Sequence, residues 1–417
     1  MGQVGKRIFT IPAGMRIFFL NQLKSCSEFQ LMSSPKAEQG AIPLFRRKKF
    51  LLGVLASLML LISALIAVRI FLEQQTQMTP LIPDVALSEP AAVEEKSAGF
   101  ADSNFLATVE PPLNEISPFS GQAVQANVLP LAVVIENDPV SRAQMRGLAE
   151  ATLVLEAPVE GGVTRFLAIF EDSQNLRKIG PVRSARSYLV DFAAEFEAAL
   201  VHAGGSPAAL AQLVRSPLFH FDEDGLVLYR DLKFPKPHNL FVNLAALSAI
   251  VQQRKQTEAK INSAAVERER IESVFAFKGK IPLTAQDQSV FTFNFSFPVF
   301  SVRYSFDPEG GTYQRFLGGV LHTDAAGVEV RPANVVVKFI GYQVSDSAGR
   351  LVLAQVQKGS AWFFSAGKFW QGTWQKSGAR TKFFNSDNSP VSLKPGQTFI
   401  TILDSAERVQ LLAEGQE

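Results

Sequence analysis

The sequence predicts an α/β domain with a mixed sheet, then a mainly-β domain, both behind a single transmembrane helix. Between residues 118 and 265, apolar runs typical of buried strands alternate with helix-forming segments. Between residues 292 and 412, apolar and polar residues alternate and are interrupted by turns rich in Gly, Pro and Asp, as in a β-sandwich or barrel. Residues 50–68 form an uncharged apolar run of membrane-spanning length.

The apolar run from Phe50 to Val68 predicts the membrane helix. At about 1.5 Å per residue, it can cross a hydrocarbon core of roughly 30 Å, with help from the apolar residues up to 72. Four basic residues, 46–49, precede it directly, whereas only Arg69 follows closely. The positive-inside rule therefore predicts an uncleaved signal anchor over 50–72, with a cytoplasmic N-terminus and extracytoplasmic C-terminal domains in the cell membrane.

Composition excludes several classes of protein. The 417 residues are 47% hydrophobic and 19% charged, which is too apolar for general disorder. The net charge is +2, but residues 1–49 alone carry nine Lys and Arg against Glu28 and Glu38, so the remainder is acidic and unsuited to nucleic acid. The single cysteine, Cys26, lies in this basic tail, which excludes a disulfide framework or a cysteine-rich zinc site. We predict neither a metal nor a cofactor, and the sequence makes no prediction of oligomeric state.

Two segments of biased composition separate the predicted domains. Residues 73–117 are acidic and rich in Pro and Ala, which indicates a flexible spacer. Residues 266–291 form a charged connector with few apolar positions. The α/β domain should therefore span 118–265 and the β-rich domain 292–412, and we expect the two to be separable.

The α/β domain contains four predicted strands and three predicted helices. The strands are the apolar runs at 129–136, 153–158, 163–170 and 198–204. The helices are predicted at 141–151, 182–197 and 206–214.

Three arginines of this domain predict an anion-binding site. Arg165 interrupts an apolar strand, where a permanent charge needs a partner. Arg183 and Arg186 are three residues apart after Pro181, so they should share one face at the start of a helix, beside its free N–H groups. Alternatively, the arginines form an internal network with Glu156, Glu160 or Asp191.

Further candidates lie in loops at the ends of strands. The segment HAGGSP (202–207) could cradle a phosphate through backbone N–H groups, although it could also be an ordinary turn before a helix. The candidate anion-binding residues, expected to line one pocket, are Arg165, Arg183, Arg186, His202, Gly204, Gly205 and Ser206, with Glu160, Asp231, His238 and Asn239 as secondary candidates.

Two other motifs favour a structural interpretation. Residues 222–225 (DEDG) look like the start of a calcium loop, but Lys233 occupies the position of its last glutamate, so we predict a turn. The tryptophans Trp362, Trp370 and Trp374 could stack on a sugar but are more typical of a core or a half-buried sheet.

Long motifs in both domains resemble the YerB-like lipoproteins, a bacterial family of unknown function. They are LAVVIENDPVSRAQMRGLAEA, LVLEAPVEGGVTRFLAIF, KIGPVRSARSYLVDF, VHAGGSP and KPHNLFVN in the first domain, with GKFWQGTWQK and LKPGQTFITIL in the second. The resemblance implies two domains and an envelope location, but no activity. Members often carry a lipobox cysteine, whereas Cys26 precedes the apolar span.

A weaker likeness concerns the LytR-CpsA-Psr phosphotransferases, which act on polyprenyl-pyrophosphate glycopolymers. An arginine-led strand (165–169), Pro181-Val182-Arg183-Ser184 and Ala203-Gly204-Gly205 are similar to that family in order and spacing. The family's acid is missing, because Ser184 or Ala185 stands in its place. Three functions thus compete: binding of a cell-wall or phospho-glycan anion, a phosphotransferase, and a non-catalytic envelope scaffold.

Overall fold

The computed structural model of the protein describes residues 114–125, 129–223, 225, 227–261, 273–278, 280–378 and 380–413. The predicted basic tail (1–49), the predicted anchor (50–72) and the linker up to residue 113 lie outside these ranges. Each helix within them is too short or too polar to cross a bilayer. The anchor therefore stays a prediction from the sequence.

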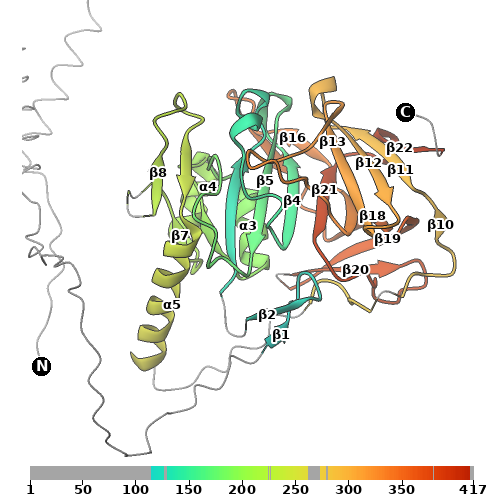
Figure 1. Ribbon diagram of the computed structural model, residues 1–417, viewed down its shortest axis with the longest axis horizontal. Helices are drawn as coiled ribbons and strands as arrows, with labels where there is room; N and C mark the ends of the chain where they lie inside the picture. The colour runs from blue at the N-terminus through green and yellow to red at the C-terminus, as the bar shows by residue number, and fades with distance from the viewer. Residues whose placement is uncertain are drawn as a thin grey trace, which may run out of the picture. The chain divides into compact units, whose positions relative to one another are not determined.

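An eleven-stranded mixed sheet runs through both halves of the described chain (Figure 1). In order across the sheet, its strands are β10 (Gln286–Asp287), β19 (Lys368–Ser377), β18 (Lys358–Ser365), β15 (Asn334–Phe339), β21 (Thr398–Leu403), β4 (Leu153–Pro158), β5 (Thr164–Phe170), β3 (Leu131–Glu136), β6 (Ala199–Val201) and β7 (His220–Phe221), while β20 (Arg380–Asn385) also pairs with β19. The pairs β3–β6, β6–β7, β4–β21 and β15–β21 are parallel. The first half is thus a mixed sheet with few helices.

The second half is mainly β. Its own antiparallel sheet has the order β14 (Val320–Leu321), β13 (Thr312–Leu317), β12 (Ser301–Asp307), β11 (Val290–Asn294) and β22 (Val409–Leu412). Side chains of β13 alternate between buried and half-buried, as the sequence pattern predicts. Three two-stranded ribbons complete the strands: β1 (Asn114–Ile116) with β2 (Ala123–Gln125), β8 (Leu228–Arg230) with β9 (Leu240–Val242), and β16 (Tyr342–Val344) with β17 (Leu351–Leu353).

The described helices are few. They are α3 (Ser187–Glu195), α4 (Pro207–Arg215) and α5 (Leu244–Ile261), with the 3₁₀ helices η1 (Pro139–Gln144), η2 (Glu160–Gly162), η3 (Pro298–Phe300) and η4 (Ala406–Arg408). The start of α4 agrees with the prediction, because the Ser206 hydroxyl caps it by accepting a hydrogen bond from the Ala209 N–H. The predicted helix at 141–151 is reduced to η1, since the chain turns extended at Met145 and takes a positive φ of 105° at Gly147.

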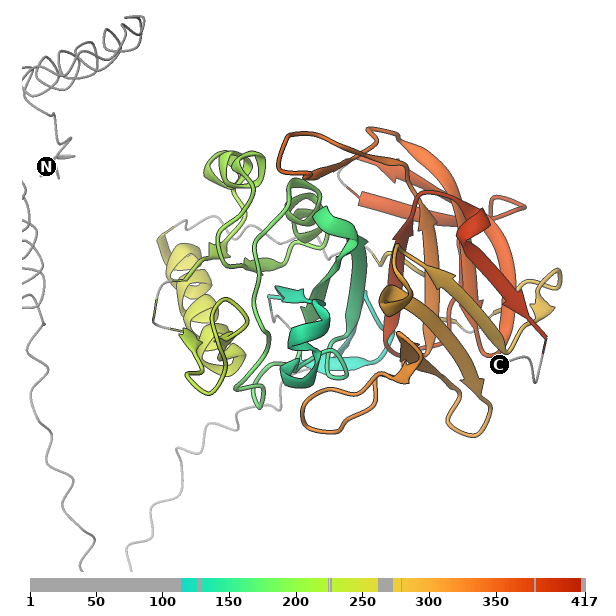
Figure 2. The same ribbon diagram turned by 90° about the horizontal axis from the view of Figure 1, so that it is seen from above.

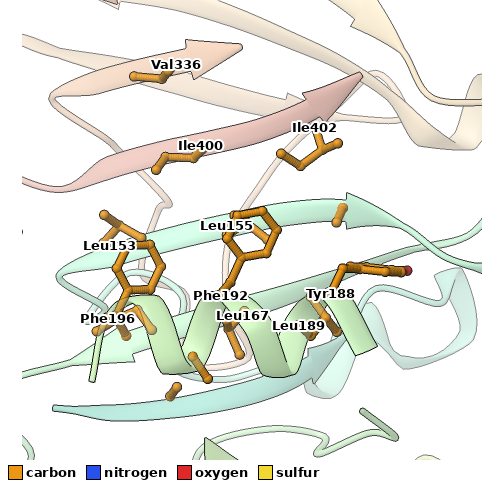
Figure 3. Close-up of a cluster of buried hydrophobic side chains, with 14 of the residues drawn as sticks. Leu153, Leu155, Leu167, Tyr188, Leu189, Phe192, Phe196, Val336, Ile400 and Ile402 are labelled. Carbon is orange, nitrogen blue, oxygen red and sulfur yellow. The ribbon is translucent and has the colours of Figure 1, made fainter. Parts of the chain in front are cut away.

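The two faces of the first half of the sheet bury different cores. Helices α3 and α4 cover one face, where Leu189, Phe192 and Leu213 are buried. Figure 3 shows residues of α3 packed against β4 and β21. The first turns of α5 cover the opposite face through Leu244 and Leu247. Because side chains alternate along a strand, the central strands supply both cores, which explains their uninterrupted apolar runs.

A third core lies between the two sheets of the second half, which face each other in Figure 2. Trp370 and Trp374 are buried in the core that α3 covers, and their indole N–H groups donate to Asn385 Oδ1 (2.9 Å) and to the Phe339 carbonyl (3.2 Å). This agrees with the core interpretation of these tryptophans.

Strand β21 joins the two halves. It lies between β4 of the first half and β15 of the second, parallel to both. Its residues enter all three cores. Phe399 is buried in the core on the α5 side, and Ile400 and Ile402 are buried in the core on the α3 side. Leu403 is buried in the core between the two sheets of the second half. The expectation of separable domains stays a prediction, but this pairing argues against it, because without β21 one side of β4 would have no neighbour. The boundaries at 118, 265 and 292 stay predictions.

A fully buried ion pair also connects the halves. Glu156 on β4 accepts a hydrogen bond of 2.7 Å from the Arg315 guanidinium on β13, and neither side chain is exposed to solvent. The Arg315 guanidinium also donates hydrogen bonds to the Tyr304 hydroxyl at 3.1 Å and to His322 Nδ1 at 2.6 Å. Burial and the nearby Arg315 charge hold the pKa of His322 well below its usual value, so His322 is neutral and accepts this bond.

Candidate anion-binding site

The predicted arginines come together where β3 ends and β5 begins. Glu136, the last residue of β3, is the register partner of Arg165, so both side chains lie on the face that α3 covers. On the other side of β3, residues 181–183 run in an extended conformation. The Glu136 N–H donates to the Pro181 carbonyl at 3.0 Å, and the Arg183 N–H donates to the Val134 carbonyl at 2.9 Å. This backbone pairing thus places the Arg183 side chain beside Glu136.

Arg183 and Arg186 do not share a helix face, contrary to the prediction. Helix α3 begins only at Ser187, and Arg186 is its N-cap residue with extended dihedral angles (φ −122°, ψ 151°). The helix starts later than Pro181 because residues 181–183 are held against the end of β3. The two side chains consequently find different carboxylates.

Glu160 on η2 holds two of the arginines. Arg186 donates from Nε to Glu160 Oε2 at 2.9 Å, and its Nη2 also bonds to Oε1. Arg165 Nη2 lies 3.7 Å from the same Oε1. Both arginines also donate to the Ser184 carbonyl, the residue that stands in place of the phosphotransferase acid. Arg186 is only 6% exposed, whereas Glu160 is 29% exposed and is the outermost member of this group.

Glu136 holds the third arginine together with His238. Arg183 Nη2 lies 2.5 Å from Glu136 Oε1, and His238 Nδ1 lies 2.9 and 3.0 Å from the two carboxylate oxygens. Arg183 also donates to the Pro237 carbonyl at 3.2 Å. Glu136 is almost completely buried, so the Arg183 guanidinium compensates its charge and His238 adds a hydrogen-bond contact.

The cluster carries a surplus of positive charge. Three guanidinium groups face two carboxylates, which leaves one positive charge. Burial and the neighbouring Arg186 charge lower the pKa of Arg165 to about 10. Burial alone would raise the pKa of Glu160, but the hydrogen bonds and charges of Arg186 and Arg165 hold it below its usual value.

The HAGGSP loop is used inside the protein. Gly204 N–H donates to Asp222 Oδ1 at 2.7 Å, and the Ser206 hydroxyl caps α4. His202 is buried, which lowers its pKa, and its Nδ1 lies 2.9 Å from the Gly204 carbonyl. A bridge between Ala185 and Gly205 ties the loop to the arginine-bearing segment. His202, Gly204, Gly205 and Ser206 therefore position the backbone, and the structure does not show the predicted phosphate cradle.

The secondary candidates Asp231 and Asn239 support the loop that carries His238. Asp231 pairs with Lys178 at 2.5 Å and also accepts a hydrogen bond from the Lys233 N–H. The two hydrogen bonds lower the pKa of the Asp231 carboxyl. The Asn239 amide donates to the Phe234 carbonyl at 3.1 Å and accepts from Arg230 at 2.8 Å. Among the described residues, no hydrogen bond or ion pair joins Asp231 or Asn239 to Arg165, Arg183 or Arg186.

The internal network that the sequence left open is what the structure shows, with partly different partners. Of the three acids proposed for it, only Glu160 binds the arginines; Glu156 pairs with Arg315, and Asp191 accepts from Gln212 at 2.6 Å. Glu136 was missed. Its signal is a carboxylate that ends the apolar run LAVVIE. Asp222 likewise serves as a turn residue, since its Oδ1 accepts from the Glu223 N–H at 2.8 Å.

Comparison with known proteins shows which family this chain belongs to. Residues 119–258 match the family described as "Protein of unknown function (DUF3048) N-terminal domain", and residues 292–400 match its C-terminal domain. The chain is 28% identical over 302 residues to the protein named "Putative lipoprotein YerB" of Bacillus subtilis (strain 168). This alignment covers 71% of this chain and 88% of that protein.

The fold is similar as well. A crystal structure of the YerB protein from Bacillus subtilis superposes with a TM-score of 0.61 at 24% identity, over 71% of this chain and 99% of the other. The resemblance to YerB-like proteins inferred from sequence motifs is thereby confirmed. The two matched domains together cover more than half of the chain, and the chain belongs to the two-domain DUF3048 family.

Proposed function

We propose that this protein is a membrane-anchored, extracytoplasmic protein of the cell envelope that binds a phosphate- or glycan-linked anion at the arginine cluster. The location is supported by the apolar run 50–68 with its preceding basic residues, and by a relative whose name is "Putative lipoprotein YerB". The binding activity rests on the geometry of Glu160.

Glu160 is the main support for the proposal, because its carboxylate binds the arginines in the way a ligand anion would. It meets Arg186 through two hydrogen bonds and lies 3.7 Å from Arg165, as a phosphate oxygen pair would. It is also the most exposed member of the group and belongs to the short η2 turn, in which Gly161 and Gly162 both have positive φ. A phosphate group bears more charge and more acceptor atoms than this carboxylate, so it can displace the Glu160 side chain from the arginines.

Binding of pyrophosphate to the purified full-length chain tests the proposal by calorimetry. Glu160→Gln removes the competing charge and keeps the side-chain shape, so we expect pyrophosphate to bind about tenfold more tightly, which corresponds to about 1.4 kcal/mol. Arg186→Gln should abolish binding. Glu223→Gln, which removes a carboxylate paired with the more exposed Arg230, is the matched control and should change nothing.

Absence of pyrophosphate binding in both the wild type and Glu160→Gln would contradict the proposal. The cluster would then be a structural network, and the envelope scaffold would be the better function.

A further inference from the structure

The second half of the chain contributes apolar side chains next to the anion site. Ser296 Oγ donates to the Gly162 carbonyl at the end of η2. A Cβ placed on Gly162 would lie 3.0 Å from Phe297 Cε2, so the Phe297 ring packs directly on the turn that carries Glu160. Phe297 is nevertheless 60% exposed, which is unusual for a ring of this size.

Two more exposed apolar residues lie on neighbouring turns. Val299, 38% exposed, accepts a hydrogen bond of 2.8 Å at its carbonyl from Arg142 of the first half. The backbone of Gly318 approaches the same carbonyl so closely that a Cβ there would lie 3.0 Å away. The chain then turns through Gly319 into Val320, which is 69% exposed. We name Phe297, Val299 and Val320 the apolar wall.

The wall and the anion site are held together rigidly. Arg315, which forms the buried pair with Glu156, lies on β13, and this strand leads into the turn before Val320. The Ser296–Gly162 and Arg142–Val299 hydrogen bonds add two links across the same boundary. These contacts attach the apolar wall to the turn that carries Glu160.

We propose that the ligand of the anion site is amphiphilic: a phosphate headgroup on Arg165 and Arg186, with a hydrocarbon chain lying across Phe297, Val299 and Val320. This inference rests on the proposed anion-binding function and names its ligand class. A single lipid phosphate fits better than a membrane surface. Arg165 and Arg186 are mostly buried and converge on the one carboxylate of Glu160, whereas binding to a bilayer surface uses displayed basic residues.

The test compares two ligands with the same headgroup, octyl phosphate and methyl phosphate. Their binding to the full-length chain in phosphatidylcholine nanodiscs is measured by calorimetry, with empty nanodiscs as the blank. We expect octyl phosphate to bind at least about tenfold more tightly, because only its chain buries apolar surface on the wall. Phe297→Ser and Val320→Ser should each reduce this advantage and leave methyl phosphate binding unchanged. Val344→Ser, an exposed valine on β16, is the matched control.

The outcomes separate this inference from the proposed function. Equal binding of both ligands to the wild type overturns the amphiphilic ligand but leaves the anion site standing. An octyl advantage that survives Phe297→Ser and Val320→Ser overturns the apolar wall. If neither phosphate binds, the anion site itself is wrong and the inference fails with it.

Discussion

At the scale of single residues, buried charges dominate both the joint between the halves and the candidate site. Removing Glu156 and Arg315 from water costs several kcal/mol per ion, and only excellent geometry with further hydrogen bonds offsets this. Thr164, Tyr304 and His322 supply those bonds. The pair consequently penalises any arrangement of the halves that separates its members.

We expect Arg315→Met to destabilise the protein by about 3–5 kcal/mol, because it leaves Glu156 buried without a cation. Urea unfolding of the purified chain measures this difference. Arg303→Met, on the neighbouring strand β12, is the control, since Arg303 lies 3.8 Å from the Phe316 ring and should contribute about 0.5–1 kcal/mol. Adding Glu156→Gln to Arg315→Met should recover part of the loss. A cost for Arg315→Met no larger than for Arg303→Met would show that the pair does not hold the halves together.

The candidate site could be predicted from the sequence only where its contacts are local. Arg165, Arg186 and Glu160 lie within the 27 residues 160–186, so both their gathering and the alternative of pairing with Glu160 followed from spacing. Glu156 finds its partner 159 residues away. A pairing at that distance depends on the packing of two sheets, which spacing does not encode.

At the scale of elements, the strands themselves were predictable but their neighbours were not. The run TFITIL is correctly a strand, since it is apolar and rich in β-branched residues. Nothing in those six residues shows that they lie between β4 and β15. Similarly, the apolar period predicted a helix after Pro181, but pairing of residues 181–183 with β3 delayed its start.

A fragment of residues 118–265 should fail to fold, because it lacks β21 and thus exposes one side of β4 and part of two cores. We expect no cooperative urea transition and poorly dispersed amide signals in its NMR spectrum. The control fragment, 118–412, contains both halves of the chain. It should show a cooperative urea transition and well-dispersed amide signals. A cooperative transition for the shorter fragment would restore the expectation of independent domains.

At the scale of the whole molecule, the placement of the domains depends on the segment before them. The basic cluster at 46–49 and the apolar run after it predict that everything beyond residue 72 lies outside the cytoplasm. This position would give an envelope anion site access to lipid or cell-wall ligands. The acidic spacer (73–117) would set its distance from the bilayer.

Alkaline phosphatase fused after Glu417 should therefore be active in bacterial cells, since the enzyme matures only outside the cytoplasm, where its disulfides form. The same enzyme fused after Lys49, before the apolar run, should be inactive and serves as the control. An inactive C-terminal fusion with normal expression would contradict the predicted topology.

The central position of β21 also has a consequence for the order of events during biosynthesis. Residues 398–403 begin 240 residues after the end of β4, yet they lie directly beside it in the sheet. The large sheet cannot be completed until nearly the whole described chain is available, so its contact order is high and its folding slow. A chain that cannot complete its sheet until late in synthesis can still pass through a narrow membrane channel as an extended polypeptide, before it folds.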